Sequence, residues 1–174
     1  MASSDVLVDA FERIRDAVHP AVNGLSAEQL AFRPNGESNS IAWLVWHLTR
    51  IQDDDVAGLH RIEQAWTEGG WSEHFALPFD PADTGYGHGP DDVAKVTADA
   101  ALLLGYFEAV HEKTVAYLRT LSNADLEQVV DPSWDPPVTV GIRLVSVIAD
   151  DLQHVGQAAY VRGMVQRLGD SAVR

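Results

Sequence analysis

Four long segments of this chain repeat their apolar residues at the spacing of an α-helix, and this pattern limits the possible folds most strongly. The segments run from about Asp5 to Val22, from a Ser38-Asn39-Ser40 cap to about Trp66, from Pro90 to Leu121, and from about Thr139 to Leu168. No strand-like alternation appears outside the loops. The pattern predicts an all-α fold, a four-helix bundle spanning residues 1–174 as one domain, with a long crossover loop between its second and third helices.

A weak internal repeat divides the chain into two helix–turn–helix halves. The motif Leu25-Ser26-Ala27-Glu28-Gln29-Leu30 follows the first helix, and Leu121-Ser122-Asn123-Ala124-Asp125-Leu126 follows the third. We interpret Ser26 and Ser122 as helix caps and not as nucleophiles, because a serine oxygen accepts the free backbone amides of a helical turn. The second and fourth helices are therefore matching elements.

The composition argues against several classes of protein. The net charge is −14 and the sequence pI is about 4.6, so we expect neither nucleic acid nor a membrane surface as a partner. The chain has no cysteine, which excludes thiolate metal ligands and a cysteine nucleophile. No signal-peptide pattern is visible, and no apolar run approaches the ~20 residues of a membrane span. We expect a soluble, cytoplasmic protein.

Three residues on the two matching helices form a candidate site: His47, Asp150 and His154. Residues four apart on a helix lie about 5–6 Å apart at Cβ and point the same way, so Asp150 and His154 can share one cation. His47, from a facing helix, would complete a three-ligand site that leaves one coordination position open. The residues alone leave two interpretations: a metal site, or an Asp–His pair with an unrelated core histidine.

Other residues compete for a place in this site. His111, on the third helix, is a candidate ligand or hydrogen-bond donor. Asp54 lies two turns beyond His47 and is a candidate for orienting an imidazole, although Asp53-Asp54-Asp55 as a whole is interpreted as a solvated acidic turn. His74 and His88 have no partner at ligand spacing.

The segment from Thr67 to Gly89 is long, contains several Gly and Pro residues, and carries the aromatic residues Trp71, Phe75, Phe79 and Tyr86. Unstructured loops longer than ~12–15 residues in compact domains are usually functional or disordered. We expect this segment to cover the metal end of the bundle as a lid that helps bind an electrophile. Simple packing on the surface is the alternative.

The sequence resembles the DinB-like superfamily of bacterial four-helix bundles. The motifs that carry the resemblance are Leu25-Ser26 with Leu30, Arg33-Pro34, Asn39-Ser40-Ile41-Ala42-Trp43-Leu44-Val45-Trp46-His47-Leu48, Asp150-Asp151-Leu152-Gln153-His154-Val155-Gly156-Gln157 and Tyr160-Val161-Arg162-Gly163. The resemblance implies a divalent metal, usually zinc or nickel, bound by His47, Asp150 and His154. Many relatives have His in place of Asp150; the carboxylate adds negative charge and weakens the Lewis acidity of the metal.

The resemblance also implies a function. Members of this superfamily include thiol S-transferases that use mycothiol, bacillithiol or glutathione, and a mycothiol-dependent maleylpyruvate isomerase. Arg outnumbers Lys ten to two, a bias that suits a GC-rich bacterial genome and favours mycothiol, the actinobacterial thiol. We therefore expect a metal-dependent thiol S-transferase with mycothiol as cosubstrate, in which the metal turns the bound thiol into a thiolate.

Two other functions stay open: a metal-dependent hydrolase that uses the same site to activate water, and a non-catalytic metal-binding stress or interaction bundle. The expected partners are a small-molecule thiol and an electrophile, with a second copy of the chain as a candidate homodimer partner. The sequence neighbours Arg50, Arg143 and Arg162 are candidates for binding a carboxylate of the cosubstrate.

Overall fold

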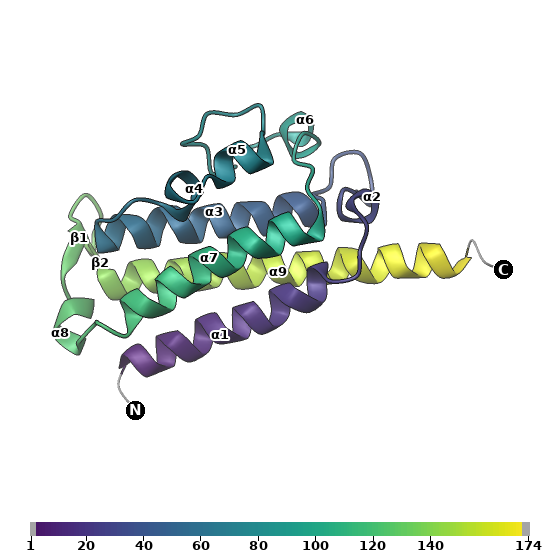
Figure 1. Ribbon diagram of the computed structural model, residues 1–174. Coiled ribbons are helices and arrows are strands. Elements are labelled where there is room, and N and C mark those ends of the chain that lie inside the picture. The colour runs from purple at the N-terminus through teal and green to yellow at the C-terminus, as the bar shows by residue number, and fades with distance from the viewer. Residues whose placement is uncertain (1–2, 172–174) are drawn as a thin grey trace.

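The computed structural model describes residues 3–171 and contains a bundle of four long helices (Figure 1). These helices are α1 (Ser3–Val22), α3 (Ile41–His60), α7 (Ala100–Leu118) and α9 (Val140–Ser171). Helices α1 and α3 each pack against both α7 and α9. Apolar side chains from all four helices fill the interior, so the predicted all-α fold is confirmed.

Serine side chains cap three of the helices, because a serine oxygen accepts a hydrogen bond from a free backbone amide of the first turn. Ser26 caps α2 (Ala27–Leu30) and Ser122 caps α8 (Asn123–Leu126), and each forms a reciprocal pair of hydrogen bonds with the residue three positions on. Ser40 caps α3 by accepting a hydrogen bond from the backbone amide of Trp43, 3.1 Å away. The interpretation of the two repeated serines as caps is confirmed.

The second long helix is shorter than the apolar pattern indicates. We expected it to reach Trp66, but α3 ends at His60, and Arg61 adopts a left-handed conformation with φ 57°. The chain then forms the separate short helix α4 (Ala65–Glu68). Positive φ is uncommon for a residue other than glycine, so the sequence carries no ordinary stop signal at this position.

The third expected helix is interrupted. Residues Pro90–Val93 form the short helix α6, and α7 begins only at Ala100. Asp99 caps the beginning of α7, because its Oδ1 accepts a hydrogen bond from the backbone amide of Leu102 at 2.8 Å. The buried Val96 lies in the irregular stretch between the two helices.

A two-stranded antiparallel hairpin, which the sequence pattern did not reveal, precedes α9. Its strands are β1 (Val129–Asp131) and β2 (Val138–Thr139). They are too short for an alternating pattern to stand out, and β1 is mostly exposed.

The crossover segment between α3 and α7 lies along the outer side of α3, whereas the C-terminal part of α9 extends beyond the other long helices (Figure 1). Besides α4 and α6, this segment contains α5 (Trp71–Phe75). Within residues 3–171, no helix is both long and apolar enough to cross a membrane.

Candidate metal centre

The fold brings His47, Asp150 and His154 together between α3 and α9. One potential ligand atom from each residue lies within 4.8 Å of the others, a group of side chains that could hold a metal ion. His47 is only 5% exposed, whereas Asp150 and His154 are half-buried. The two helices run in opposite directions, so the second turn of α3 lies beside the middle of α9 (Figure 1).

The ring of His47 is oriented by the crossover segment. Its Nδ1 lies 2.6 Å from the carbonyl oxygen of Thr84. Because a carbonyl only accepts hydrogen bonds, Nδ1 must carry the proton, and Nε2 is left with its lone pair for a metal. The ring of Trp43 stacks on the imidazole at a centroid distance of 4.6 Å. Burial lowers the pKa of His47, which favours the neutral form that binds metals.

His154 is oriented by its own helix. Its Nδ1 lies 2.8 Å from the backbone carbonyl oxygen of Asp150, so Nδ1 again donates and Nε2 is available. Burial lowers the pKa of His154, but the Asp150 carboxylate and carbonyl outweigh burial, and the net pKa is raised. Protons therefore compete with a metal more strongly at His154 than at His47.

Asp150 supplies the only oxygen of the set. Its Oδ2 lies 3.2 Å from Nδ1 of His154, but it is buried without a hydrogen bond, since that nitrogen donates to the carbonyl. A buried carboxylate oxygen without a donor is costly unless a cation approaches it. Two imidazole nitrogens and one carboxylate form a donor set that suits zinc or nickel. The residues present therefore fit a divalent metal.

The crossover segment contributes further polar groups that the spacing of residues in the sequence did not indicate. Trp43 Nε1 donates to Nδ1 of His88 at 3.2 Å, so the proton of His88 is on Nε2 and points to Asp83 Oδ2, 3.0 Å away. The other oxygen of Asp83 accepts from the backbone amide of Gly85. His88 thus joins the surroundings of the site although it has no partner at ligand spacing in the sequence.

The three arginines that we considered for binding a carboxylate of the cosubstrate all form hydrogen bonds or ion pairs within the protein. Arg50 is fully buried and donates to the carbonyl oxygens of Pro81 and Asp83 and to Gln64. Arg143 forms an ion pair with Asp55 at 2.7 Å. Arg162 donates to the backbone carbonyls of residues 21 and 23 at the end of α1.

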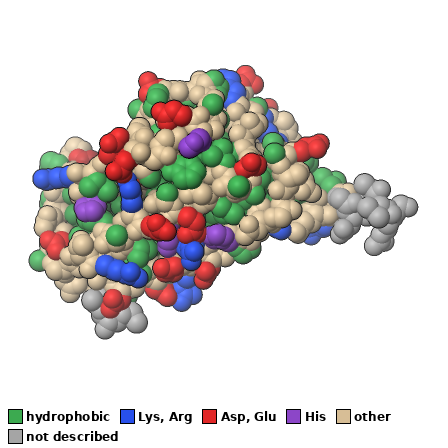
Figure 2. Space-filling view, in the orientation of Figure 1, with side chains coloured by type: hydrophobic (Ala, Val, Ile, Leu, Met, Phe, Trp, Pro, Cys, Tyr) green, Lys and Arg blue, Asp and Glu red, His purple; other side chains and the backbone are tan. Residues whose placement is uncertain are grey.

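The structure places the competing residues away from the three candidate ligands. His111 is buried on α7, where its Nε2 lies 3.4 Å from Glu12. Asp54 accepts a hydrogen bond from Gln64 and does not orient an imidazole. On the face shown in Figure 2, acidic, basic and histidine side chains gather along the seam of α1 and α7, and His111 belongs to this cluster.

The interpretation of Asp53-Asp54-Asp55 as a solvated turn is wrong. All three residues lie within α3, and Asp53 is buried. Its carboxylate accepts hydrogen bonds from the backbone amides of Ala65 and Trp66 and from the hydroxyl of Tyr106. This carboxylate therefore fastens α4 and α7 to α3.

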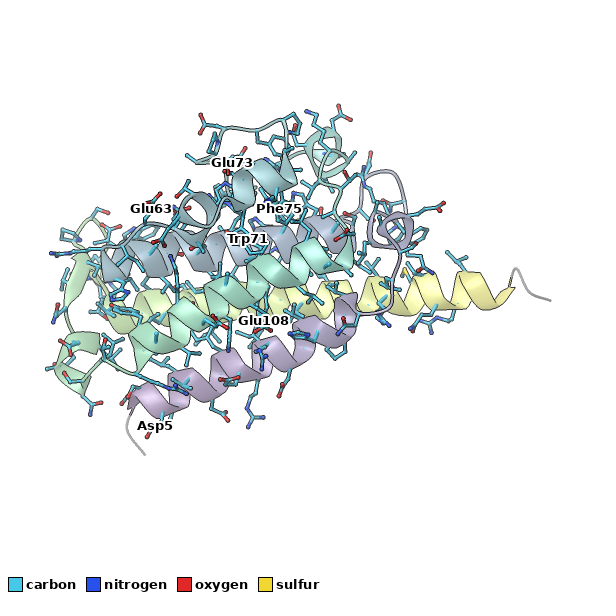
Figure 3. The ribbon with its side chains drawn as sticks, in the orientation of Figure 1. Asp5, Glu63, Trp71, Glu73, Phe75 and Glu108 are labelled. Atoms are coloured by element: carbon cyan, nitrogen blue, oxygen red, sulfur yellow. The ribbon has the colours of Figure 1, made fainter. Side chains whose placement is uncertain are left out.

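The predicted lid separates into two parts. Trp71 and Phe75 point toward the bundle (Figure 3), where both rings pack near Tyr106 of α7 at centroid distances of 5.8 and 5.9 Å. Phe75 therefore belongs to the core, and the half-buried Trp71 packs against it. Residues 83–88 are the part that contacts the site, through the carbonyl of Thr84 and the side chain of His88.

Fold and site together define a four-helix bundle with a candidate centre of two histidines and one aspartate between two of its helices. Comparison with protein families matches residues 10–158 to the DinB superfamily. The chain belongs to this superfamily.

A solved structure from Enterococcus faecalis, described as a conserved protein of its locus, is similar to the chain. It is 31% identical in sequence with a TM-score of 0.88, over 95% of this chain and 98% of that one. No curated protein matches the sequence.

Proposed function

We propose that this protein is a metal-dependent thiol S-transferase. His47, Asp150 and His154 would hold a divalent ion, zinc or nickel, and mycothiol would be the thiol cosubstrate. The observation that carries the proposal is the convergence of the three ligand atoms within 4.8 Å, with both histidines held so that Nε2 is free. A bound divalent ion lowers the pKa of a coordinated thiol, so that a thiolate is available near neutral pH.

Other requirements of the reaction are met by the ligands and by the residues that cover the centre. His47 and His154 supply neutral nitrogens, and Asp150 supplies one negative charge that partly neutralises a dication. Trp43 and residues 83–88 cover His47 and keep water from that side of the centre. Because the chain has no cysteine, the sulfur must come from a cosubstrate. Mycothiol is favoured by the arginine-rich composition described above.

Metal analysis coupled to a panel of thiols tests this function. Untagged protein should contain about one zinc or nickel ion per chain, since a three-residue site holds one ion. His154→Ala should lose the metal, whereas the same change at His74, an exposed residue of α5, should retain it. Equal metal content in both variants would contradict the ligand set.

The loaded protein is then offered monochlorobimane with mycothiol, bacillithiol, glutathione or no thiol. We expect acceleration with mycothiol, loss of it on chelation, and recovery on addition of zinc or nickel. Acceleration of no thiol reaction, together with hydrolysis of an ester or amide, would replace the transferase by a hydrolase. A metal-loaded protein that does neither would be a binding module.

A further inference from the structure

The outward face of α9 carries no charge over most of its length. Helix α9 packs against α1 and α3, and its opposite face is open to solvent. Between residues 140 and 165, every exposed residue of this helix is uncharged. These residues are Ile142, Val145, Ser146, Ala149, Leu152, Gln153, Gly156, Gln157, Ala159 and Tyr160. A surface helix normally turns charged and polar residues outward, so this face lacks the usual polar covering.

The acidic and basic residues of the same stretch lie toward the neighbouring helices. Arg143 forms an ion pair with Asp55 of α3, and Arg162 donates to backbone carbonyls at the end of α1. Asp150 belongs to the candidate metal centre, and Asp151 is fully buried. The stretch is therefore not poor in charge; its charges are kept away from the outward face.

The outward faces of α1 and α7 are different. Their exposed residues include charged side chains, namely Asp5, Asp9, Arg13 and Asp16 of α1 and Glu112 of α7. Because the net charge of the chain is −14, two copies repel each other wherever their carboxylates meet. A second copy can approach the outward face of α9 without opposing like charges and without burying an unpaired one.

The apolar residues of this face repeat at alternating intervals of three and four residues. We call them the apolar stripe: Ile142, Val145, Ala149, Leu152, Gly156 and Ala159. The average interval of 3.5 residues is the period of the seam between two helices that wind around each other. At 1.5 Å per residue, the stripe is about 26 Å long. Its period therefore favours a second helix as its partner.

The sizes of the side chains in the apolar stripe favour an antiparallel partner. If a second α9 ran antiparallel about a two-fold axis between residues 150 and 151, each pair across the seam would join a large residue to a small one. The facing pairs would be Ile142 with Ala159, Val145 with Gly156, and Ala149 with Leu152. A large side chain then fills the space that a small one leaves, as close packing requires. A parallel pair would instead set glycine against glycine and leave a gap.

We propose that two copies of this chain form a symmetric dimer through the apolar stripe, with their α9 helices antiparallel. A two-fold axis lets the same patch serve both copies, and the stripe complements itself in this way. The C-terminal part of α9 extends beyond the other long helices, so it is open to a neighbour along its length (Figure 1). A contact about 26 Å long and about 10 Å wide is smaller than a standard interface, so the dimer should dissociate reversibly.

The first experiment measures the mass of the full-length protein by sedimentation equilibrium, with chelator present so that no metal bridges two copies. The mass of the wild type should rise from 19.0 kDa toward twice that value between about 1 µM and about 1 mM protein. Val145→Glu should raise the dissociation constant of the dimer at least about tenfold, because each interface would bury an unpaired carboxylate. Its matched control is Val6→Glu on α1, which should leave the constant unchanged. Val145 is 58% exposed and Val6 is 54% exposed, so neither change disturbs the core.

The second experiment tests the antiparallel register by cross-linking, for which a chain without cysteine is well suited. Val145→Cys and Gly156→Cys are combined in one chain, and a Cβ at position 156 would meet nothing within 4 Å. The two positions lie about 16 Å apart along the helix, too far for a disulfide within one copy. Mild oxidation should therefore join two copies of the double variant. Val145→Cys alone should not cross-link, because position 145 faces position 156 of the second copy.

Several results would overturn this proposal. A wild-type protein that stays monomeric up to about 1 mM would reject the dimer. Dimers weakened by Val6→Glu but not by Val145→Glu would place the interface on another face. Cross-linking of Val145→Cys alone as fast as of the double variant would reject the antiparallel register. A monomer that binds phosphatidylcholine vesicles, and loses this binding in Val145→Glu, would make the stripe a lipid-binding face instead.

Discussion

Gly85 brings the crossover segment against His47, and its role can be tested with one methyl group. Its φ is +88°, and a Cβ would lie 2.9 Å from Nδ1 of His47 and 2.8 Å from the ring of Trp46. Gly87 has a similar φ of +80° but open space around it. We expect Gly87→Ala to show only the left-handed strain of about 1–2 kcal/mol.

Gly85→Ala should show the same strain and should lower the free energy of unfolding by about a further 1–3 kcal/mol, because the added methyl group overpacks the site. It should also weaken zinc binding, because His47 must move. Urea unfolding and competition with a chromogenic chelator measure the two effects. Equal zinc affinity in the two variants would show that the loop does not position His47.

His111 should make the stability of the protein depend on pH. Burial lowers its pKa and outweighs the nearby carboxylates of Glu12 and Glu108, so the folded protein binds this proton less readily than the unfolded chain does. Stability contributed by neutral His111 is therefore present above the unfolded pKa of about 6.5. It is lost as the pH falls from there to the lower folded pKa, by at most about 1.4 kcal/mol per pH unit.

The variant His111→Gln removes this titration. Its free energy of unfolding in urea, measured with chelator present between pH 7.5 and pH 5, should fall less steeply with decreasing pH than that of the wild-type protein. An unchanged slope would mean that His111 titrates alike in the folded and unfolded states.

At the scale of elements, the attachment of the crossover segment to α3 depends on Arg50. This buried guanidinium donates to two carbonyls of the segment and lies 3.8 Å from the buried carboxylate of Asp53. Lysine keeps the positive charge but cannot reproduce the fork of donors. Arg50→Lys should therefore leave buried carbonyl oxygens without a donor and destabilise the protein by about 1–3 kcal/mol. Hydrogen exchange should rise most at residues 79–88.

Arg143→Lys is the control for this change, because its ion pair with Asp55 is half-buried and should contribute about 1 kcal/mol or less. A uniform rise in exchange along the whole chain after Arg50→Lys would indicate a general loss of stability and not release of the crossover segment.

The elements that the sequence predicted well are those with long periodic patterns. The first and fourth helices end within a few residues of the expected positions, because their apolar faces continue to the boundary. The breaks at Arg61 and before Ala100 were missed, since both depend on tertiary contacts. Asp53 accepts a hydrogen bond from the backbone of α4, and the buried Val96 lies in an irregular stretch before α7.

At the scale of the whole molecule, the candidate ligands were accessible from the sequence because two share one helix face and the third follows a recognisable motif. Their surroundings were not, because the path of residues 81–88 is set by Arg50, which the sequence offered only as a candidate for binding a carboxylate of the cosubstrate. The carbonyl of Thr84 is a backbone group, so the identity of the residue does not reveal its role. His88 reaches the site only because the chain follows this path.

Because the candidate ligands come from two helices, metal binding should stabilise the whole fold. An ion that binds only the folded protein stabilises it by about 2.7 kcal/mol at 100 times its dissociation constant. For a chain of this size, that energy corresponds to a rise in melting temperature of about 5–10 °C. Calorimetry of the metal-free protein with and without zinc should show this rise for the wild type and for His74→Ala, and no rise for His47→Gln. A similar rise in His47→Gln would place the zinc elsewhere in the protein.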